Sequence, residues 1–172
     1  MKTRVWCGLD RIETADSVLR KGRVGLMTNP CGISHDFVST VDIVKRRYQL
    51  SALFACEHGI RGDIFAGEKV EDYTDPVSKI PVYSLYGKRH KPTPEILKDI
   101  DVLVYDLQDN GCRSYTYVAT MGRCMAAAAD AGKEFVVLDR PNPLGGLKVE
   151  GNMNEKPFQS SVNYWATPYV YG

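Results

Sequence analysis

The segment of residues 57–63 combines the residue types that acid–base chemistry needs. It carries Glu57, His58, Arg61 and Asp63, together with two glycines that allow tight turns. Because Glu57 directly follows an apolar run, we expect partial burial, which favours the protonated form of a carboxyl group and suits donation of a proton to a leaving group. We therefore predict that Glu57 is a general acid. The alternative is that Glu57 forms a local ion pair with Arg61 or another cation.

A second cluster of polar residues begins directly after another apolar run. It consists of Asp106, Gln108, Asp109, Arg113, Tyr115 and Tyr117. This mixture of acids, an amide, a guanidinium group and phenols is suited to binding sugar hydroxyls and a carboxylate, and Arg113 is able to form a forked pair with an acid. The alternative for Arg113 is an internal salt bridge to Asp106 or Asp109.

Polar residues also follow the remaining apolar runs, at Asn29 and at residues 139–142, which include Arg140 and Asn142. In open α/β sheets, ligands bind beyond the carboxyl ends of the strands, so we expect these side chains to converge on one crevice. Since Asp and Asn are also common turn residues, a purely structural role is the alternative for residues 139–142. His58 is interpreted as a ligand-binding residue, with a structural hydrogen bond as its alternative.

The elements that would position these residues alternate between strands and helices. Runs rich in Val, Leu, Phe and Tyr predict strands at residues 23–27, 50–55, 81–85, 102–105 and 135–138. Helical spacing and capping residues predict helices from Ser39 or Thr40 to Tyr48, from Thr93 onward, and at residues 117–131 before Gly132. Residues 56–79 are expected to form a long loop. This pattern predicts an α/β fold, a doubly wound, mostly parallel sheet with helices on both faces.

Composition and charge argue against several classes of protein. The chain has 172 residues, 44% of them hydrophobic, and a net charge of +1 without a basic stripe, so nucleic acid is not an expected partner. We find no apolar run long enough to span a membrane and no signal peptide, and we expect no membrane partner and a cytoplasmic location. Neither a GxGxxG motif nor a Walker A loop is present, which argues against a nucleotide-using enzyme.

The cysteines and histidines predict neither a disulfide framework nor a metal site. The five cysteines lack CxxC spacing, and the three histidines are widely separated. We expect reduced and mostly inert thiols, with Cys31 and Cys56 as the two that are candidates for reactivity because each follows a predicted strand. No metal and no cofactor are expected.

Short motifs along nearly the whole chain occur in the same order as in one known family. They are Asn29-Pro30-x-Gly32, Glu57-His58-Gly59-x-Arg61-Gly62, Ala66-Gly67-Glu68, Pro81-Val82-Tyr83-Ser84-Leu85-Tyr86-Gly87, Pro92-Thr93-Pro94, Asp106-x-Gln108-Asp109 and Leu138-Asp139-Arg140-Pro141-Asn142-Pro143-Leu144-Gly145-Gly146. In these motifs the chain resembles the exo-β-N-acetylmuramidase NamZ family. The resemblance implies a Rossmann-like N-terminal domain and hydrolysis of terminal β-linked N-acetylmuramic acid from the non-reducing ends of peptidoglycan fragments.

The resemblance also implies roles for individual residues. The glutamate of the Glu-His-Gly motif, here Glu57, is the family's proposed catalytic acid. The second group of the reaction would be a carboxylate, with Asp106, Asp109 and Glu68 as candidates, or the acetamido group of the substrate, and the carboxylate separation would distinguish inversion from retention. The candidates for a clamp on the lactyl carboxylate of N-acetylmuramic acid are Arg61, Arg113 and Arg140.

The resemblance sets an expectation about domain organisation as well. Residues 1–172 are expected to form the N-terminal catalytic domain, with residues 147–172 as a tail toward a C-terminal domain that family members have. Many relatives are exported, so a cytoplasmic role in muropeptide recycling and an exported role both stay open. The alternative to a glycosidase is a muropeptide-binding or inactive fragment, whose exposed apolar surface would favour self-association.

Overall fold

The computed structural model, which describes residues 4–65, 67–68 and 71–171, is built on one mostly parallel sheet. Within these residues six strands lie in the order β3-β4-β2-β1-β5-β6, and all neighbours are parallel except β3 and β4. The strands are β1 (Arg23–Thr28), β2 (Gln49–Ala55), β3 (Tyr73–Thr74), β4 (Pro81–Ser84), β5 (Val102–Asp106) and β6 (Glu134–Val137). The predicted α/β sheet is confirmed, and the short edge strand β3 is an addition inside the predicted long loop.

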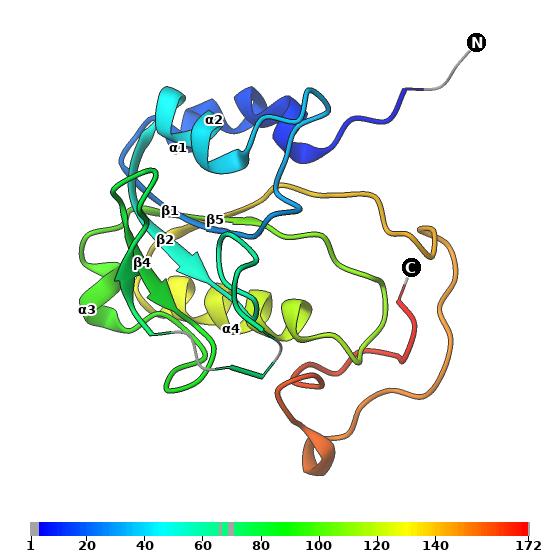
Figure 1. The fold of residues 1–172 in the computed structure, drawn as a ribbon. Coiled ribbons are helices and arrows are strands. Elements are labelled where there is room, and N and C mark those ends of the chain that lie inside the picture. The colour runs from blue at the N-terminus through cyan, green and yellow to red at the C-terminus, as the bar shows by residue number, and fades with distance from the viewer. Residues whose placement is uncertain (1–3, 66, 69–70, 172) are drawn as a thin grey trace.

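Helices cover both faces of the sheet (Figure 1). The 3₁₀ helix η1 (Gly8–Ala15), α1 (Asp16–Leu19) and α2 (Thr40–Arg47) lie on one face, and α3 (Pro94–Leu97) and α4 (Thr116–Asp130) lie on the other. The sequence analysis missed η1 and α1, because Cys7 and Ala15, which stand at their N-cap positions, are not typical capping residues. In the part of the chain that the structure describes, no helix has both the length and the apolar character needed to cross a membrane.

The helix ends follow capping residues in the sequence. The Ser39 hydroxyl accepts a hydrogen bond from the backbone N–H of Asp42 at 3.1 Å and so caps α2. Thr93 caps α3 in the same way, with Pro94 at the first helical position. Gly132 ends α4 with a φ of 64°, a conformation that glycine adopts at little cost. These signals fix where the loops begin, and the loops carry most of the polar residues singled out above.

Two apolar layers hold the helices against the sheet. Neighbouring residues of β1 point to opposite faces, so Leu26 packs in the layer that includes Val44 of α2, and Met27 packs in the layer that includes Cys124 of α4. Phe54 of β2 is also completely buried. Because burial of one large apolar side chain contributes about 1.5–3 kcal/mol, these layers fix the strands firmly and with them the positions of the strand ends.

The tail after β6 is held to the rest of the chain along α4 (Figure 1). It has little regular structure beyond the 3₁₀ helix η2 (Lys156–Phe158). The Arg113 guanidinium donates to the backbone oxygens of Asn152 and Thr167, at 2.8 and 2.9 Å. The indole of Trp165 lies so close to Gly122 that a Cβ there would be 1.7 Å from the indole nitrogen. The tail is therefore tied to a fixed place on α4.

Candidate active site

A polar crevice lies beyond the carboxyl ends of β1, β2, β4 and β5 and has a volume of about 470 Å³. It is lined by Asn29, Cys31, Glu57, His58, Tyr86, Gln108, Asn110, Ser114, Tyr115, Thr116, Tyr117, Ser161 and Val162. The strand order reverses at β1, because β2 lies on one side of it and β5 on the other. Ligands of doubly wound folds bind at such a point, and the volume falls within the range of about 300–1,000 Å³ of small-molecule sites.

Glu57 is the single carboxylic acid among the described residues that line this crevice. It is half-buried at the start of the turn after β2, where His58 and Gly59 have φ values of 72° and 74° and turn the chain sharply. The Thr116 hydroxyl donates to Oε2 of Glu57 at 3.3 Å. The Tyr86 hydroxyl lies beside Glu57, and its interaction with this carboxylate, followed by partial burial, raises the pKa of Tyr86. Glu57 therefore faces the crevice with hydroxyl donors beside it.

The imidazole of His58 is oriented by the loop that follows it. Its Nδ1 lies 3.3 Å from the backbone oxygen of Ile64. A carbonyl oxygen only accepts hydrogen bonds, so Nδ1 carries the hydrogen and donates it. In the neutral ring Nε2 is then the acceptor nitrogen, and it becomes a donor when the ring is protonated.

The crevice also offers amide and phenol groups. The Asn29 side chain accepts from the backbone N–H of Cys31 at 3.0 Å and donates to the Tyr117 hydroxyl at 3.2 Å. Gln108 donates to the backbone oxygen of Asp109 at 2.7 Å, which orients its amide. The side chain of Tyr115 is 47% exposed. The structure thus brings Asn29, Gln108 and Tyr115 into the crevice with Glu57 and His58, as the strand-end rule predicts.

Asp106 lies outside the crevice, in a buried ion pair. Its side chain is completely buried, and Arg140 donates to both of its oxygens at 2.6 and 2.9 Å. The Thr40 hydroxyl donates to the same carboxylate, and Arg140 also reaches the backbone oxygen of Ile33. A buried charge that loses its partner is strongly unfavourable, so this pair holds three loops together. The sequence analysis expected both Asp106 and Arg140 in the crevice, and the structure places both outside it.

Arg61 is likewise committed to an internal partner. Its guanidinium donates to both oxygens of Asp75, at 3.1 and 2.8 Å, and the carboxylate of Asp75 is completely buried. The hydrogen bonds from Arg61, assisted by Ser78, hold the pKa of Asp75 well below its usual range. Arg61 therefore fixes the long loop between β2 and β4, and it neither pairs with Glu57 nor lines the crevice.

The remaining predicted site residues bind the tail or lie exposed on the surface. Asp109 accepts a hydrogen bond from the Tyr171 hydroxyl at 2.7 Å, and Asn142 donates to the backbone oxygen of Tyr171 at 2.8 Å. Arg113, described above, also anchors the tail. Glu68 is exposed and does not line the crevice, and Ala66, the first residue of its motif, lies outside the described residues. None of the three arginines predicted to clamp a carboxylate faces the crevice, because each has internal partners.

The sequence analysis missed several lining residues. Tyr86 follows β4 by two positions, so the strand-end rule would have found it if it had been applied to that strand. Thr116 is the first residue of α4, which the sequence analysis began one residue later. Ser161 and Val162 come from the tail, and no pattern in the sequence indicated that the tail reaches Glu57.

The cysteine thiols differ in exposure. All five are free, Cys31 is exposed at the crevice, and Cys56 is buried. Burial, together with the nearby charge of Glu57, raises the pKa of Cys56 to about 12. Cys56 is therefore a poor candidate for reactivity, because its thiolate is strongly disfavoured. In the described ranges of the chain, no group of three or more His, Cys, Asp or Glu side chains is arranged to hold a metal ion.

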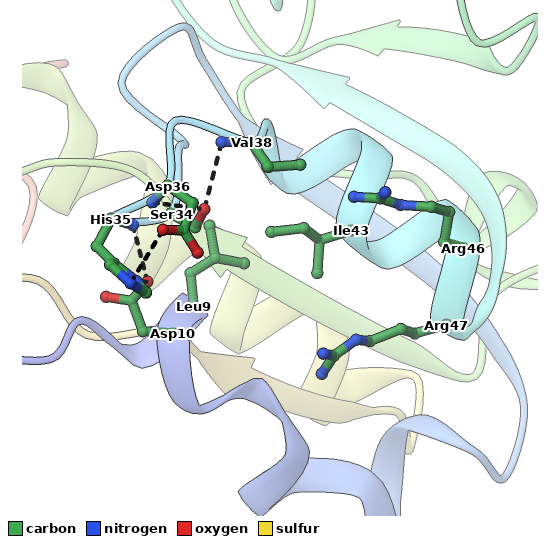
Figure 2. A pocket seen from close by; sticks show the side chains of 9 residues that line it. All are labelled: Leu9, Asp10, Ser34, His35, Asp36, Val38, Ile43, Arg46 and Arg47. Atoms are coloured by element: carbon green, nitrogen blue, oxygen red, sulfur yellow. Dashed lines mark hydrogen bonds and ion pairs between the residues drawn. The ribbon is translucent and has the colours of Figure 1, made fainter.

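A second hollow, of about 420 Å³, lies between η1 and α2 (Figure 2). Arg46 and Arg47 extend from α2 on one side, and His35 faces Asp10 on the other. Asp10 accepts bonds from the backbone and from Nδ1 of His35, at 2.9 and 3.1 Å. Although partial burial opposes ionisation of Asp10, these bonds and one from Cys7 keep its pKa low. Asp10 is thus engaged in holding a loop to η1, unlike Glu57, and the second acid of the hollow, Asp36, lies 3.2 Å from Nε2 of His35.

Comparisons with known proteins identify the family of the chain. The family profile described as "Exo-beta-N-acetylmuramidase NamZ, N-terminal" matches residues 24–172. The "Peptidoglycan beta-N-acetylmuramidase NamZ" of Bacillus subtilis (strain 168) is 46% identical over 174 residues, which cover 99% of this chain and 42% of that protein.

Two solved structures of DUF1343 family proteins from Bacteroides fragilis NCTC 9343 have the same fold. One has a TM-score of 0.90 and 51% identity, covering 100% of this chain and 44% of its own. The other has a TM-score of 0.78 and 27% identity, covering 99% of this chain and 44% of its own. The chain thus spans less than half the length of each of these relatives.

Proposed function

The chain belongs to the NamZ family of exo-β-N-acetylmuramidases, and we propose that its crevice binds the terminal N-acetylmuramic acid of a peptidoglycan fragment and that Glu57 is the general acid. The observation that carries the proposal is the setting of Glu57. Of the described residues that line the crevice it is the single acid, the Thr116 hydroxyl donates to it, and the Tyr86 hydroxyl lies beside it. Such an acid is available for proton transfer, whereas an acid in an ion pair is held in its charged form. Residues 1–172 form the N-terminal catalytic domain in this proposal.

In the proposed reaction Glu57 donates its proton to the glycosidic oxygen while the bond between C1 and that oxygen breaks. The oxygen of a water molecule then bonds to C1, and the proton that this water releases returns to Glu57. Thr116 and Tyr86 keep the carboxyl group directed into the crevice, which orients the proton for transfer. The amides of Asn29 and Gln108 and the phenols of Tyr115 and Tyr117 bind sugar hydroxyls.

The second group of the reaction, we infer, is the 2-acetamido group of the substrate. Three carboxylates were candidates for this role, but Asp106 is paired with Arg140, Asp109 accepts from Tyr171, and Glu68 is exposed outside the crevice. The acetamido oxygen would bond to C1 as the leaving oxygen departs, and water would then open this cyclic intermediate with overall retention of configuration. If so, an N-trifluoroacetyl substrate should be cleaved far more slowly than the N-acetyl substrate, and equal rates would exclude this step.

The test is release of 4-nitrophenol from 4-nitrophenyl β-N-acetylmuramide by the 172-residue chain. Glu57→Gln should lower the rate by about 10²–10⁴-fold, the usual contribution of a general acid. Glu134→Gln is the matched control, because Glu134 is exposed at the start of β6, at the opposite end of the sheet from the crevice. A wild-type rate in Glu57→Gln would refute the proposed role of this residue.

A muropeptide-binding role is the second candidate function. It is favoured by the composition of the crevice, in which hydroxyl and amide side chains accompany a single acid among the residues described. In this case a muropeptide would raise the melting temperature of the folded chain, no 4-nitrophenol would be released, and Glu57→Gln would keep the stabilisation. Release of 4-nitrophenol that depends on Glu57 would exclude it.

A further inference from the structure

The charge of the proposed substrate has no obvious partner in the crevice. N-acetylmuramic acid carries a carboxylate on its lactyl group, which a protein usually binds with a cation. The lining residues that the structure describes include neither lysine nor arginine. Arg61 and Arg140 are each bound to a buried carboxylate, and Arg113 donates to two backbone oxygens of the tail. A guanidinium clamp would therefore require one of these pairs to break.

His58 is the lining residue that is able to carry a positive charge near neutral pH. The carbonyl of Ile64 takes the hydrogen of Nδ1, so Nε2 is the ring nitrogen left for a ligand. The half-buried ring is the neighbour of Glu57 in the chain, and the φ of 72° at His58 fixes the turn that directs both residues. The ring is thus oriented before any ligand binds.

We propose that His58 recognises the lactyl carboxylate of N-acetylmuramic acid, by donating a hydrogen bond from Nε2 in the protonated ring. This inference rests on the proposed function and assigns the substrate selectivity of the same site. The neutral ring accepts at Nε2 and suits a hydroxyl, whereas the protonated ring donates and suits a carboxylate. The chain would therefore prefer the acidic sugar at low pH and lose that preference as the ring loses its proton.

Other titratable groups line the same crevice and affect whether a protonated His58 ring and a bound carboxylate are favoured. Glu57 precedes His58, Tyr86 follows β4, Tyr117 belongs to α4, and Cys31 lies in the loop after β1. Burial raises the pKa of Tyr117, and the interaction with Glu57 raises the pKa of Tyr86, so both phenols stay neutral near neutral pH. Ionised Glu57 would repel a second carboxylate but favour a protonated ring. His58 and Glu57 are thus the two charged side chains of the described lining that the lactyl carboxylate would meet.

The test compares the dissociation constants of the methyl β-glycosides of N-acetylmuramic acid and N-acetylglucosamine, which differ in the lactyl group. For the wild-type chain at about pH 5.5 we expect about tenfold tighter binding of the acidic sugar, the strength of one charge-assisted hydrogen bond, and a smaller ratio at about pH 8. His58→Asn should abolish the preference at both pH values. Asparagine tolerates the left-handed backbone of this position, so the variant should keep the turn. The control is His90→Asn, since His90 is exposed and does not line the crevice.

A second measurement does not depend on a variant. Binding of the acidic sugar should move the titration midpoint of the His58 ring to higher pH in an NMR titration, whereas N-acetylglucosamine should not, because binding and protonation are linked. A preference that survives in His58→Asn, or a ring titration that does not respond to the acidic sugar, would overturn the inference. Equal binding of both sugars by the wild type, with turnover that still needs Glu57, would reject the role of His58 and leave the proposed function intact. Absence of binding and turnover in the folded chain would reject both.

Discussion

Glu57 and Asp106 occupy comparable places in the sheet and have opposite surroundings. Glu57 follows β2 and Asp106 ends β5, and both strands are neighbours of β1. Asp106 is completely buried and paired with Arg140, whereas Glu57 is half-buried at the crevice and accepts from hydroxyls. The position at a strand end is therefore not enough to make an acid available for catalysis. The partner that the fold supplies decides whether the acid holds loops together or faces a ligand.

The largest expected effect comes from breaking the buried ion pair of Asp106 and Arg140. Arg140→Met would leave the Asp106 carboxylate buried without its partner, and we expect a loss of about 3–5 kcal/mol in the free energy of unfolding, measured by urea denaturation. The double variant Asp106→Leu/Arg140→Met should be more stable than Arg140→Met alone, because it removes both charges. An unchanged denaturation midpoint in Arg140→Met would mean that the pair does not hold these loops.

A smaller loss is expected for Arg61→Gln, because Arg61 is more exposed than Arg140, with side-chain exposures of 31% and 7%. We expect about 2 kcal/mol at pH 7, the value of hydrogen bonds to a charged group. The pKa of Asp75 is lower in the folded chain than in the unfolded chain, so the stability that Arg61 provides is present above about pH 4 and is lost as the pH falls further.

The deficit of Arg61→Gln relative to the wild type should therefore shrink between about pH 7 and pH 3. Denaturation at the two pH values checks this expectation. Arg46→Gln serves as the control, since Arg46 is exposed and should change stability by no more than about 0.5 kcal/mol. The same deficit for Arg61→Gln at both pH values would show that the loss does not arise from the charge of Asp75.

The smallest effect on stability is expected at Glu57, the acid that lines the crevice. Glu57→Gln should change the free energy of unfolding by less than about 1 kcal/mol, because an amide oxygen still accepts from Thr116 and Tyr86. The matched replacement Asp106→Asn should cost several times more, since it removes the charge that Arg140 needs. Equal losses in the two variants would remove the difference between the two acids on which the proposed function depends.

The sequence predicted the sheet and several positions in the crevice, because strand ends are visible in the apolar pattern. Glu57, Asn29 and Gln108 all follow such runs and all line the crevice. The choice of partners was not predictable, because reasoning from sequence pairs charges that are close along the chain. Arg61 does not pair with the nearby Glu57 and instead donates to Asp75, 14 residues away. Arg140 donates to Asp106, 34 residues away. These contacts exist only once the sheet has brought the loops together.

The attachment of the tail has a consequence for the order of events during folding. Arg113 donates to the backbone oxygen of Thr167 across 54 residues, and the same tail brings Ser161 and Val162 to the crevice. Closing so long a loop is slow compared with pairing β1 and β2 or forming α4. We therefore expect α4 and the pair of β1 and β2 to protect their amide hydrogens earlier in refolding than the tail, so that the crevice acquires its last wall late. During synthesis, the proposed site would stay incomplete until the tail has left the ribosome.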